Sequence, residues 1–126
     1  MERWKQRFEN YQKAMNQLEV ACKIHKPSQV EIAGIIQIFQ YTFELGWKTL
    51  KDFLFEKGLE LKYPKEIIKT AFENEIIDDG EAWLGMLESR NLMSHTYEEE
   101  TAYDIYFDII NKYQNEFIKL RTFLKQ

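Results

Sequence analysis

The sequence has very little cysteine and histidine, and this scarcity excludes several kinds of site. Cys22 is the only cysteine among 126 residues, so no disulfide can form within the chain. The two histidines are His25 and His95. Cys22 and His25 are spaced to share a helix face, but two ligands do not make a zinc site. We therefore expect neither a metal ion nor another cofactor, and interpret Cys22 as a small core residue.

Long apolar runs and an excess of positive charge are also missing. No stretch of about 18 apolar residues is present, so we expect no membrane-spanning segment. The first ten residues, MERWKQRFEN, lack the apolar centre of a signal peptide. The net charge of −4 and the pI near 5.3 argue against a general nucleic-acid-binding surface, and we expect no DNA partner. The sequence predicts a cytoplasmic protein, which could still hold a single phosphate locally.

What the sequence does contain is enough apolar material for one folded domain. Hydrophobic residues make up 44% of the chain, which predicts a single domain over residues 1–126. The aromatic share of 15% is high for one small core. We expect the surplus to be buried in a subunit interface, and hence a homodimer.

Helical periodicity dominates the first half of the chain. Apolar residues recur at steps of four and three from Trp4 to Cys22, as on one face of an amphipathic helix. Ser28 and Glu31 fit a capping box for a second helix over about 29–57, which Gly58 would end. Apolar residues lie on nearly every face of this second helix. We expect it to be buried nearly all round, between the bundle core and a partner subunit.

The second half of the chain predicts three further helices. Pro64 suits the first turn of a short helix that continues to about Ile76. Asp78 and Glu81 fit a capping box for the next helix, which continues into residues 88–101. A last helix is expected to begin after Thr96 or Thr101 and to run almost to the end. Since alternation typical of strands is absent, we predict an all-α, antiparallel up-and-down bundle of four to five helices.

Residues 88–101, ESRNLMSHTYEEET, bring several chemically useful side chains together. Arg90 and His95 are five positions apart, so in an unbroken helix their side chains would lie about 140° apart. They converge only if the helix ends between them, or if two copies meet across a dimer axis. By spacing alone, a helix-capping arginine and a hydrogen-bonded turn histidine remain the more common arrangement.

The chemistry that Arg90 and His95 could perform together is phosphodiester cleavage. Arginine binds a phosphate through a fixed fork of donors, and histidine transfers protons near neutral pH. The pair would suffice for attack of an RNA 2′-hydroxyl on the adjacent phosphate without a metal ion.

Two neighbouring features have simpler interpretations. The segment 47–51, WKTLK, is interpreted as apolar stripe with solvated lysines, and Glu98, Glu99 and Glu100 as a helix first turn, with Thr96 and Glu99 fitting a capping box.

The arrangement of Arg90, Asn91, His95 and Tyr97 resembles the R-x4-H-x-Y motif of HEPN-domain proteins of the HepT kind. Residues 43–51, FELGWKTLK, and 77–80, IDDG, precede the motif in the order found in the nucleotidyltransferase substrate-binding family. The likeness covers nearly the whole chain, and nothing in the motif departs from the pattern. It implies a HEPN-like helical bundle that forms homodimers beside a small nucleotidyltransferase encoded nearby.

The resemblance also implies a role for each residue of the motif. HepT-like members are toxins, metal-independent ribonucleases with a composite site at the dimer cleft. Arg90 would bind phosphate and stabilise charge, Asn91 would shape the site, and His95 would be the acid–base residue. The partner nucleotidyltransferase would neutralise the toxin by transferring AMP to Tyr97.

The family name itself implies a second role, which stays open. A substrate-binding subunit would present a substrate to the nucleotidyltransferase without catalysing any step. The chain has no Gly-Ser…Asp-x-Asp signature, so it cannot supply the nucleotide transfer itself. The acidic pI favours the non-catalytic subunit, whereas the intact set of Arg90, His95 and Tyr97 favours the ribonuclease toxin.

Overall fold

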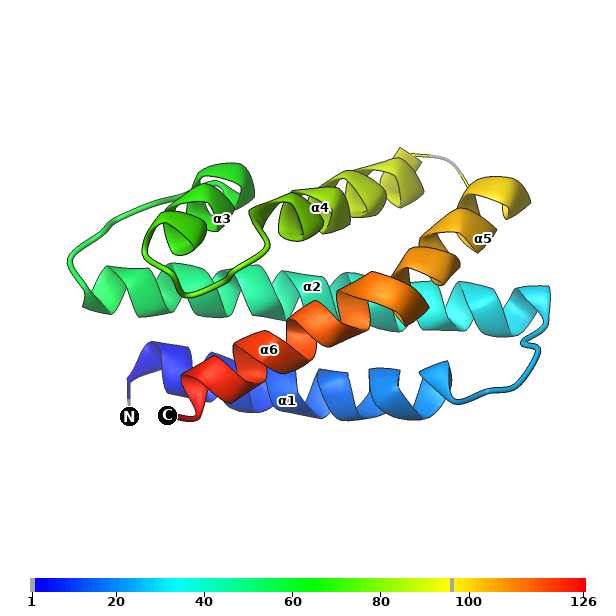
Figure 1. Ribbon diagram of the computed structural model, residues 1–126, viewed down its shortest axis with the longest axis horizontal. Coiled ribbons are helices and arrows are strands. Elements are labelled where there is room, and N and C mark those ends of the chain that lie inside the picture. Colours follow the sequence, from blue (N-terminus) through cyan, green and yellow to red (C-terminus); the bar gives the residue numbers. More distant parts are fainter. Residues whose placement is uncertain (1, 96) are drawn as a thin grey trace.

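The structure, a computed structural model, describes residues 2–95 and 97–126 and is built from helices (Figure 1). Helices α1 (Arg3–Cys22) and α2 (Gln29–Glu56) run antiparallel along one side of the molecule. Helices α3 (Pro64–Glu73) and α4 (Gly80–His95) follow each other along the other side of α2. Helix α5 (Glu99–Asp108), the π-helical turn η1 (Ile109–Tyr113) and α6 (Gln114–Leu124) cross obliquely back toward α1, so that both termini lie at the same end. The predicted all-α bundle is confirmed.

Helix α2 is the central element of the bundle, as its apolar content predicts. It contacts α1, α3, α4 and α5. Its main apolar stripe is buried, comprising Ile32, Ile36, Phe39, Phe43, Trp47, Leu50 and Leu54. The helix is nevertheless not covered on every face, because Val30 and Phe55 are exposed within this chain. The Ser28–Glu31 capping box starts α2 as predicted, and Gly58 follows it with a φ of 89°.

Aromatic rings from four helices form the centre of the core. Phe117 on α6 has its ring centroid 6.1 Å from that of Tyr11, 6.0 Å from that of Phe39 and 5.7 Å from that of Trp83. The buried Tyr11 hydroxyl donates a hydrogen bond to the backbone oxygen of Phe117 at 2.8 Å. Gly46 allows this close packing, since a Cβ atom there would lie 3.1 Å from the Tyr11 ring and 3.2 Å from Trp83.

The α3–α4 connection differs from its prediction in two ways. Helix α3 ends at Glu73 rather than near Ile76, and Glu75 adopts a left-handed backbone with a φ of 60°. The residue that caps α4 is Asp79, whose Oδ1 accepts from the backbone N–H of Ala82 at 2.9 Å. Asp78, the predicted cap, instead pairs with Lys119 on α6 at 2.7 Å. The predicted Asp78–Glu81 capping box is therefore wrong, because the residue that caps α4 is Asp79, one position later.

The predicted last helix is interrupted by a π-helical turn. The turn spans Ile109–Tyr113, between α5 and α6. Buried Tyr113 reaches α4 at Gly85, where an added Cβ atom would lie 2.9 Å from the Tyr113 hydroxyl oxygen. The wider turn and the missing side chain on α4 together accommodate this tyrosine.

Across the described chain, every helix falls short of the combined length and hydrophobicity that crossing a membrane requires.

Candidate functional site

Helix α4 presents the residues of the predicted motif at its C-terminal end. It runs without a break through Arg90, Asn91 and His95, so the helix does not end between the arginine and the histidine. One of the two ways in which these residues could meet is thereby excluded. The side chain of His95 and the whole of Thr96, including its predicted cap, lie outside the described residues.

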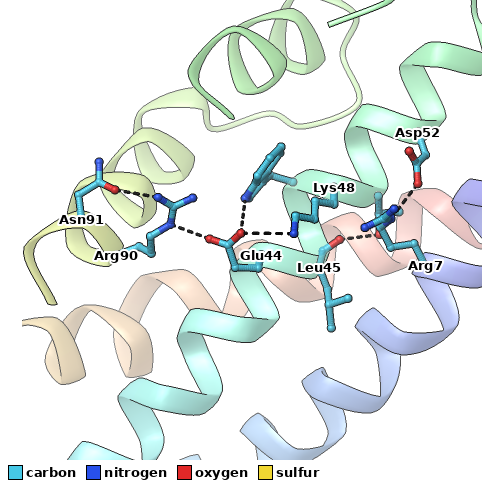
Figure 2. Close-up of polar contacts among 9 residues, drawn as sticks. Arg7, Glu44, Leu45, Lys48, Asp52, Arg90 and Asn91 are labelled. Carbon is cyan, nitrogen blue, oxygen red and sulfur yellow. Dashed lines mark hydrogen bonds and ion pairs between the residues drawn. The ribbon is translucent and has the colours of Figure 1, made fainter. Parts of the chain in front are cut away.

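Arg90 is held in a defined orientation by two oxygen acceptors (Figure 2). Its Nε donates to Oε1 of Glu44 on α2 at 2.6 Å, and its Nη1 donates to Oδ1 of Asn91 at 2.9 Å. Its Cζ lies 6.0 Å from the centre of the Phe43 ring, which supports the guanidinium from α2. Asn91 thus contacts Arg90 directly. The hydrogen bond from Nη1 holds one end of the arginine's donor fork.

Glu44 is the residue at this site that the sequence did not identify. Its second oxygen, Oε2, accepts from the indole Nε1 of Trp47 at 3.1 Å and lies 4.0 Å from Nζ of Lys48. The carboxylate therefore accepts hydrogen bonds from two donors, Arg90 on α4 and Trp47 on its own helix, and forms a longer ion pair with Lys48. The available signal was a lone acid in the otherwise uncharged stretch 32–47 of α2, next to the buried Phe43. Trp47 lies in the apolar stripe as predicted, while Lys48 is paired with Glu44 rather than simply solvated.

The donors of Arg90 are only partly used by these contacts. A guanidinium has five N–H donors, and Glu44 and Asn91 account for two of them. Contacts among the described residues do not engage the other three. About a quarter of the Arg90 side chain is exposed, 26% by area. An arginine that is fixed in orientation, partly open and equipped with remaining donors can accept a second oxyanion such as a phosphate.

Tyr97 lies in the connection between α4 and α5, as the sequence predicts, and its side chain is 53% exposed. It borders a shallow surface pocket of about 330 Å³, together with Ile32 on α2 and Tyr103 on α5. Gln29 on α2 donates to Glu99 on α5 at 3.0 Å and closes one side of this pocket. The hydroxyl of Tyr97 is therefore on a surface that another protein can approach.

Two of the three glutamates lie in the first turn of α5 as predicted, whereas Glu98 precedes the helix and Glu99 has no capping role. Helix α5 begins at Glu99, with Glu98 as the preceding N-cap residue and no side-chain hydrogen bond to the cap. Glu99 and Glu100 occupy the first turn, where a negative charge is favoured by the helix dipole. Glu99 is consequently at the first helical position, not the third position that a capping box with Thr96 would need.

Cys22 and His25 do not form a reactive site. Cys22 is half-buried, and burial raises the pKa of its thiol to about 11. Such a thiol is protonated at neutral pH and is a poor nucleophile or ligand. Within residues 2–95 and 97–126, histidine, cysteine and acidic side chains do not gather in any group of three or more suited to a metal ion.

Comparison with known proteins finds a matching family, a similar curated sequence and a similar solved structure. Residues 6–126 match the family described as nucleotidyltransferase substrate binding protein like. A protein of Haemophilus influenzae named probable ribonuclease HepT is 34% identical over 92 residues, which cover 67% of this chain and 63% of that protein. A crystal structure of a Thermus thermophilus protein superposes with a TM-score of 0.85 and 34% identity, covering 92% of this chain and 99% of the other. The chain thus spans less than two thirds of the length of the curated relative that it matches.

Proposed function

From the premise that this chain belongs to the nucleotidyltransferase substrate binding protein like family, we propose that it is a HepT-like ribonuclease toxin that a small nucleotidyltransferase neutralises. The observation that carries the proposal is Arg90, fixed by Glu44 and Asn91 with donors remaining. It stands five residues before His95 on an unbroken helix and is followed by the exposed Tyr97. The likeness to a probable ribonuclease HepT supports the same activity.

The proposed reaction breaks the RNA backbone without a metal ion. The 2′-hydroxyl oxygen attacks the adjacent phosphorus, and the bond from phosphorus to the 5′-oxygen breaks. The 2′-hydroxyl loses its proton and the leaving 5′-oxygen gains one, and His95 is the residue that transfers these protons. The remaining donors of Arg90 bind the phosphoryl oxygens and stabilise the charge that develops on them. The products are a 2′,3′-cyclic phosphate end and a 5′-hydroxyl end.

A homodimer is part of this proposal because α4 is continuous from Arg90 to His95. Five helical positions would separate two side chains by about 140°, which favours a site completed by a second copy of the chain. In a twofold dimer, Arg90 of one subunit and His95 of the other can share a cleft. Large apolar side chains that are exposed in the single chain on the two helices flanking the motif, Leu92 on α4 and Tyr103 and Phe107 on α5, support burial of additional surface.

Neutralisation is proposed to occur at Tyr97. Its hydroxyl oxygen would attack the α-phosphorus of ATP on the partner enzyme, forming a tyrosyl–AMP ester and releasing pyrophosphate and a proton. The added nucleotide would place a phosphodiester and a base near the arginine fork, where RNA must bind. The exposure of Tyr97 in the α4–α5 connection supports access by the partner.

A non-catalytic, substrate-presenting subunit is the second candidate, and the family description favours it. Two experiments separate the roles. The purified chain, in excess chelator, should cleave RNA and leave 2′,3′-cyclic phosphate ends, and its expression without the partner should arrest growth. Absence of cleavage and of growth arrest would instead support the non-catalytic role, while cleavage that requires Mg²⁺ would contradict the mechanism.

A further inference from the structure

The carboxylate of Glu44 holds Arg90 through only one of its two oxygens (Figure 2). Oε1 accepts from Nε of Arg90 at 2.6 Å, whereas Oε2 accepts from Nε1 of Trp47 at 3.1 Å and lies 4.0 Å from Nζ of Lys48. Arginine and carboxylate groups frequently pair through two parallel hydrogen bonds. Here the second oxygen accepts from Trp47, with the Lys48 ammonium in a longer ion pair, and the hydrogen bond to Arg90 is single.

This division of the carboxylate decides which donors of Arg90 remain for a ligand. A bidentate pair would use a second N–H of the guanidinium and close one of its donor edges. With a single bond from Glu44 at Nε and one from Asn91 at Nη1, the plane of the guanidinium is fixed at two points. The terminal donors are then presented in one orientation, which is what a catalytic arginine needs before its substrate arrives.

We propose that Glu44 is a positioning residue for Arg90, and that Trp47 keeps the Glu44 carboxylate from closing over the arginine's phosphate-binding edge. This inference rests on the ribonuclease function proposed above. It gives the FELGWK segment a task at the site beyond packing, with Glu44 orienting the arginine and Trp47 orienting Glu44. Glu44 lies on α2 and Arg90 on α4, so the contact also couples the site to the central helix.

The first arm of the test separates positioning from folding through kcat and KM. In Glu44→Ala, we expect kcat for an RNA oligonucleotide to fall by about 10²-fold, because Arg90 is no longer oriented. KM should not rise, since the change removes a negative charge from beside the phosphate. Glu44→Gln should recover most of kcat, because its amide oxygen can still accept from Nε. Trp47→Phe should raise KM, because Oε2 becomes available to pair with Arg90.

Asp52 provides the matched control, because it is another α2 acid paired with an arginine Nε. Asp52→Asn should lower stability and leave kcat and KM of the folded protein unchanged. If Glu44 were only structural, Glu44→Ala would behave in the same way. An unchanged kcat in folded Glu44→Ala protein would overturn the proposal.

The second arm does not depend on ribonuclease activity. The NMR signal of the Arg90 Nε–H group, assigned by its loss in Arg90→Lys, reports the hydrogen bond to Glu44 directly. It should shift and exchange faster with solvent in Glu44→Ala, and stay close to its native position in Asp52→Asn. If the wild-type protein does not cleave RNA, the proposed function fails, while this signal still decides whether Glu44 orients Arg90. A signal that is unchanged in Glu44→Ala would refute the positioning role.

Discussion

Helix α2 carries two acid–arginine pairs that look alike and differ in their surroundings (Figure 2). Asp52 pairs with Nε of Arg7 on α1 at 2.8 Å, and Glu44 pairs with Nε of Arg90 on α4 at 2.6 Å. The side chain of Asp52 is 7% exposed, whereas that of Glu44 is 32% exposed. The first acid depends on its arginine to compensate a buried charge, and the second remains accessible to water without it.

The comparison indicates that the same residue types serve different purposes at two places on one helix. The Arg7–Asp52 pair connects the long helices α1 and α2 and has no further polar partner among the contacts described. The Arg90–Glu44 pair is one part of a cluster that includes Asn91, Trp47 and Lys48. The first pair is suited to holding the fold together, and the second to presenting an arginine to a ligand.

The largest effect is expected on RNA cleavage in variants of the motif. Arg90→Ala should lower kcat by at least about 10²-fold, because a charge-stabilising donor is lost. His95→Ala should lower kcat by about 10²-fold or more, because proton transfer is lost. Both are measured as single-turnover cleavage in excess chelator. His25→Ala is the matched control, because His25 is an exposed histidine in the α1–α2 connection, outside the motif. We expect this variant to cleave RNA at the wild-type rate.

The second prediction concerns the buried pair. Arg7→Ala leaves the carboxylate of Asp52 without its partner in a buried place, and we expect the free energy of unfolding to fall by on the order of 3 kcal/mol. Arg90→Ala, at the more open pair, should cost about 1 kcal/mol or less. Urea unfolding measures both. Equal losses in the two variants would mean that the difference in exposure has no energetic consequence.

The third prediction concerns the modification of an exposed tyrosine. Co-expression with the neighbouring nucleotidyltransferase should add one or more AMP masses to the peptide that contains Tyr97. Tyr97→Phe should escape this modification and stay toxic beside the partner, because the acceptor hydroxyl is missing. Tyr103→Phe, which changes another exposed tyrosine of the same pocket, should be modified and neutralised normally. If the partner protects cells from the Tyr97→Phe variant as well as from the wild-type protein, binding alone neutralises the protein.

The smallest expected effect is a pH dependence at the end of the bundle away from Arg90. Burial raises the pKa of Glu116 above its ordinary value of 4.5, although its hydrogen bond to Lys119 opposes the shift; Asp79 and Asp78 add to the rise. The folded state therefore binds the Glu116 proton more tightly than the unfolded state does. The stability that this contributes is present below pH 4.5 and is lost as pH rises through the folded-state pKa.

Replacing Glu116 by Gln removes this titration. Glu116→Gln should therefore be more stable, relative to the wild type, at pH 7 than at pH 4. Urea unfolding at the two values measures the difference. A relative stability that is the same at both would show that Glu116 does not titrate differently in the folded and unfolded states.

Features of the fold that depend on neighbouring residues could be predicted from the sequence. The Ser28–Glu31 capping box and the left-handed Gly58 are local signals, and they set the bounds of α2. The apolar stripe predicted for α1 is buried at Phe8, Tyr11 and Met15. These elements follow from periodicity and capping alone.

Features that depend on distant residues could not be predicted in this way. Asp78 and Asp79 are adjacent acids that both suit a cap, and the choice between them depends on Lys119, which pairs with Asp78 from α6. The π-helical turn depends on Tyr113 meeting α4 at Gly85. Neither contact leaves a signal in the local sequence.

The residues of the candidate site also separate into those that the local sequence predicts and those that depend on distant contacts. The sequence predicted a site from Arg90, Asn91, His95 and Tyr97, which lie within one short segment. It did not identify Glu44, which is 46 positions from Arg90 and meets it only when α2 and α4 pack together. A lone acid in the uncharged stretch 32–47 indicated that a polar group lies opposite, but not which residue.

The measurement that tests the central claim most directly is activity in mixed dimers of Arg90→Ala and His95→Ala. If Arg90 of one subunit acts with His95 of the other, each mixed dimer contains one intact site and one site that lacks both residues. Random exchange of equal amounts should then restore about a quarter of the wild-type cleavage from two inactive proteins. No recovery in samples where mixed dimers are shown to form would contradict a site shared between the subunits.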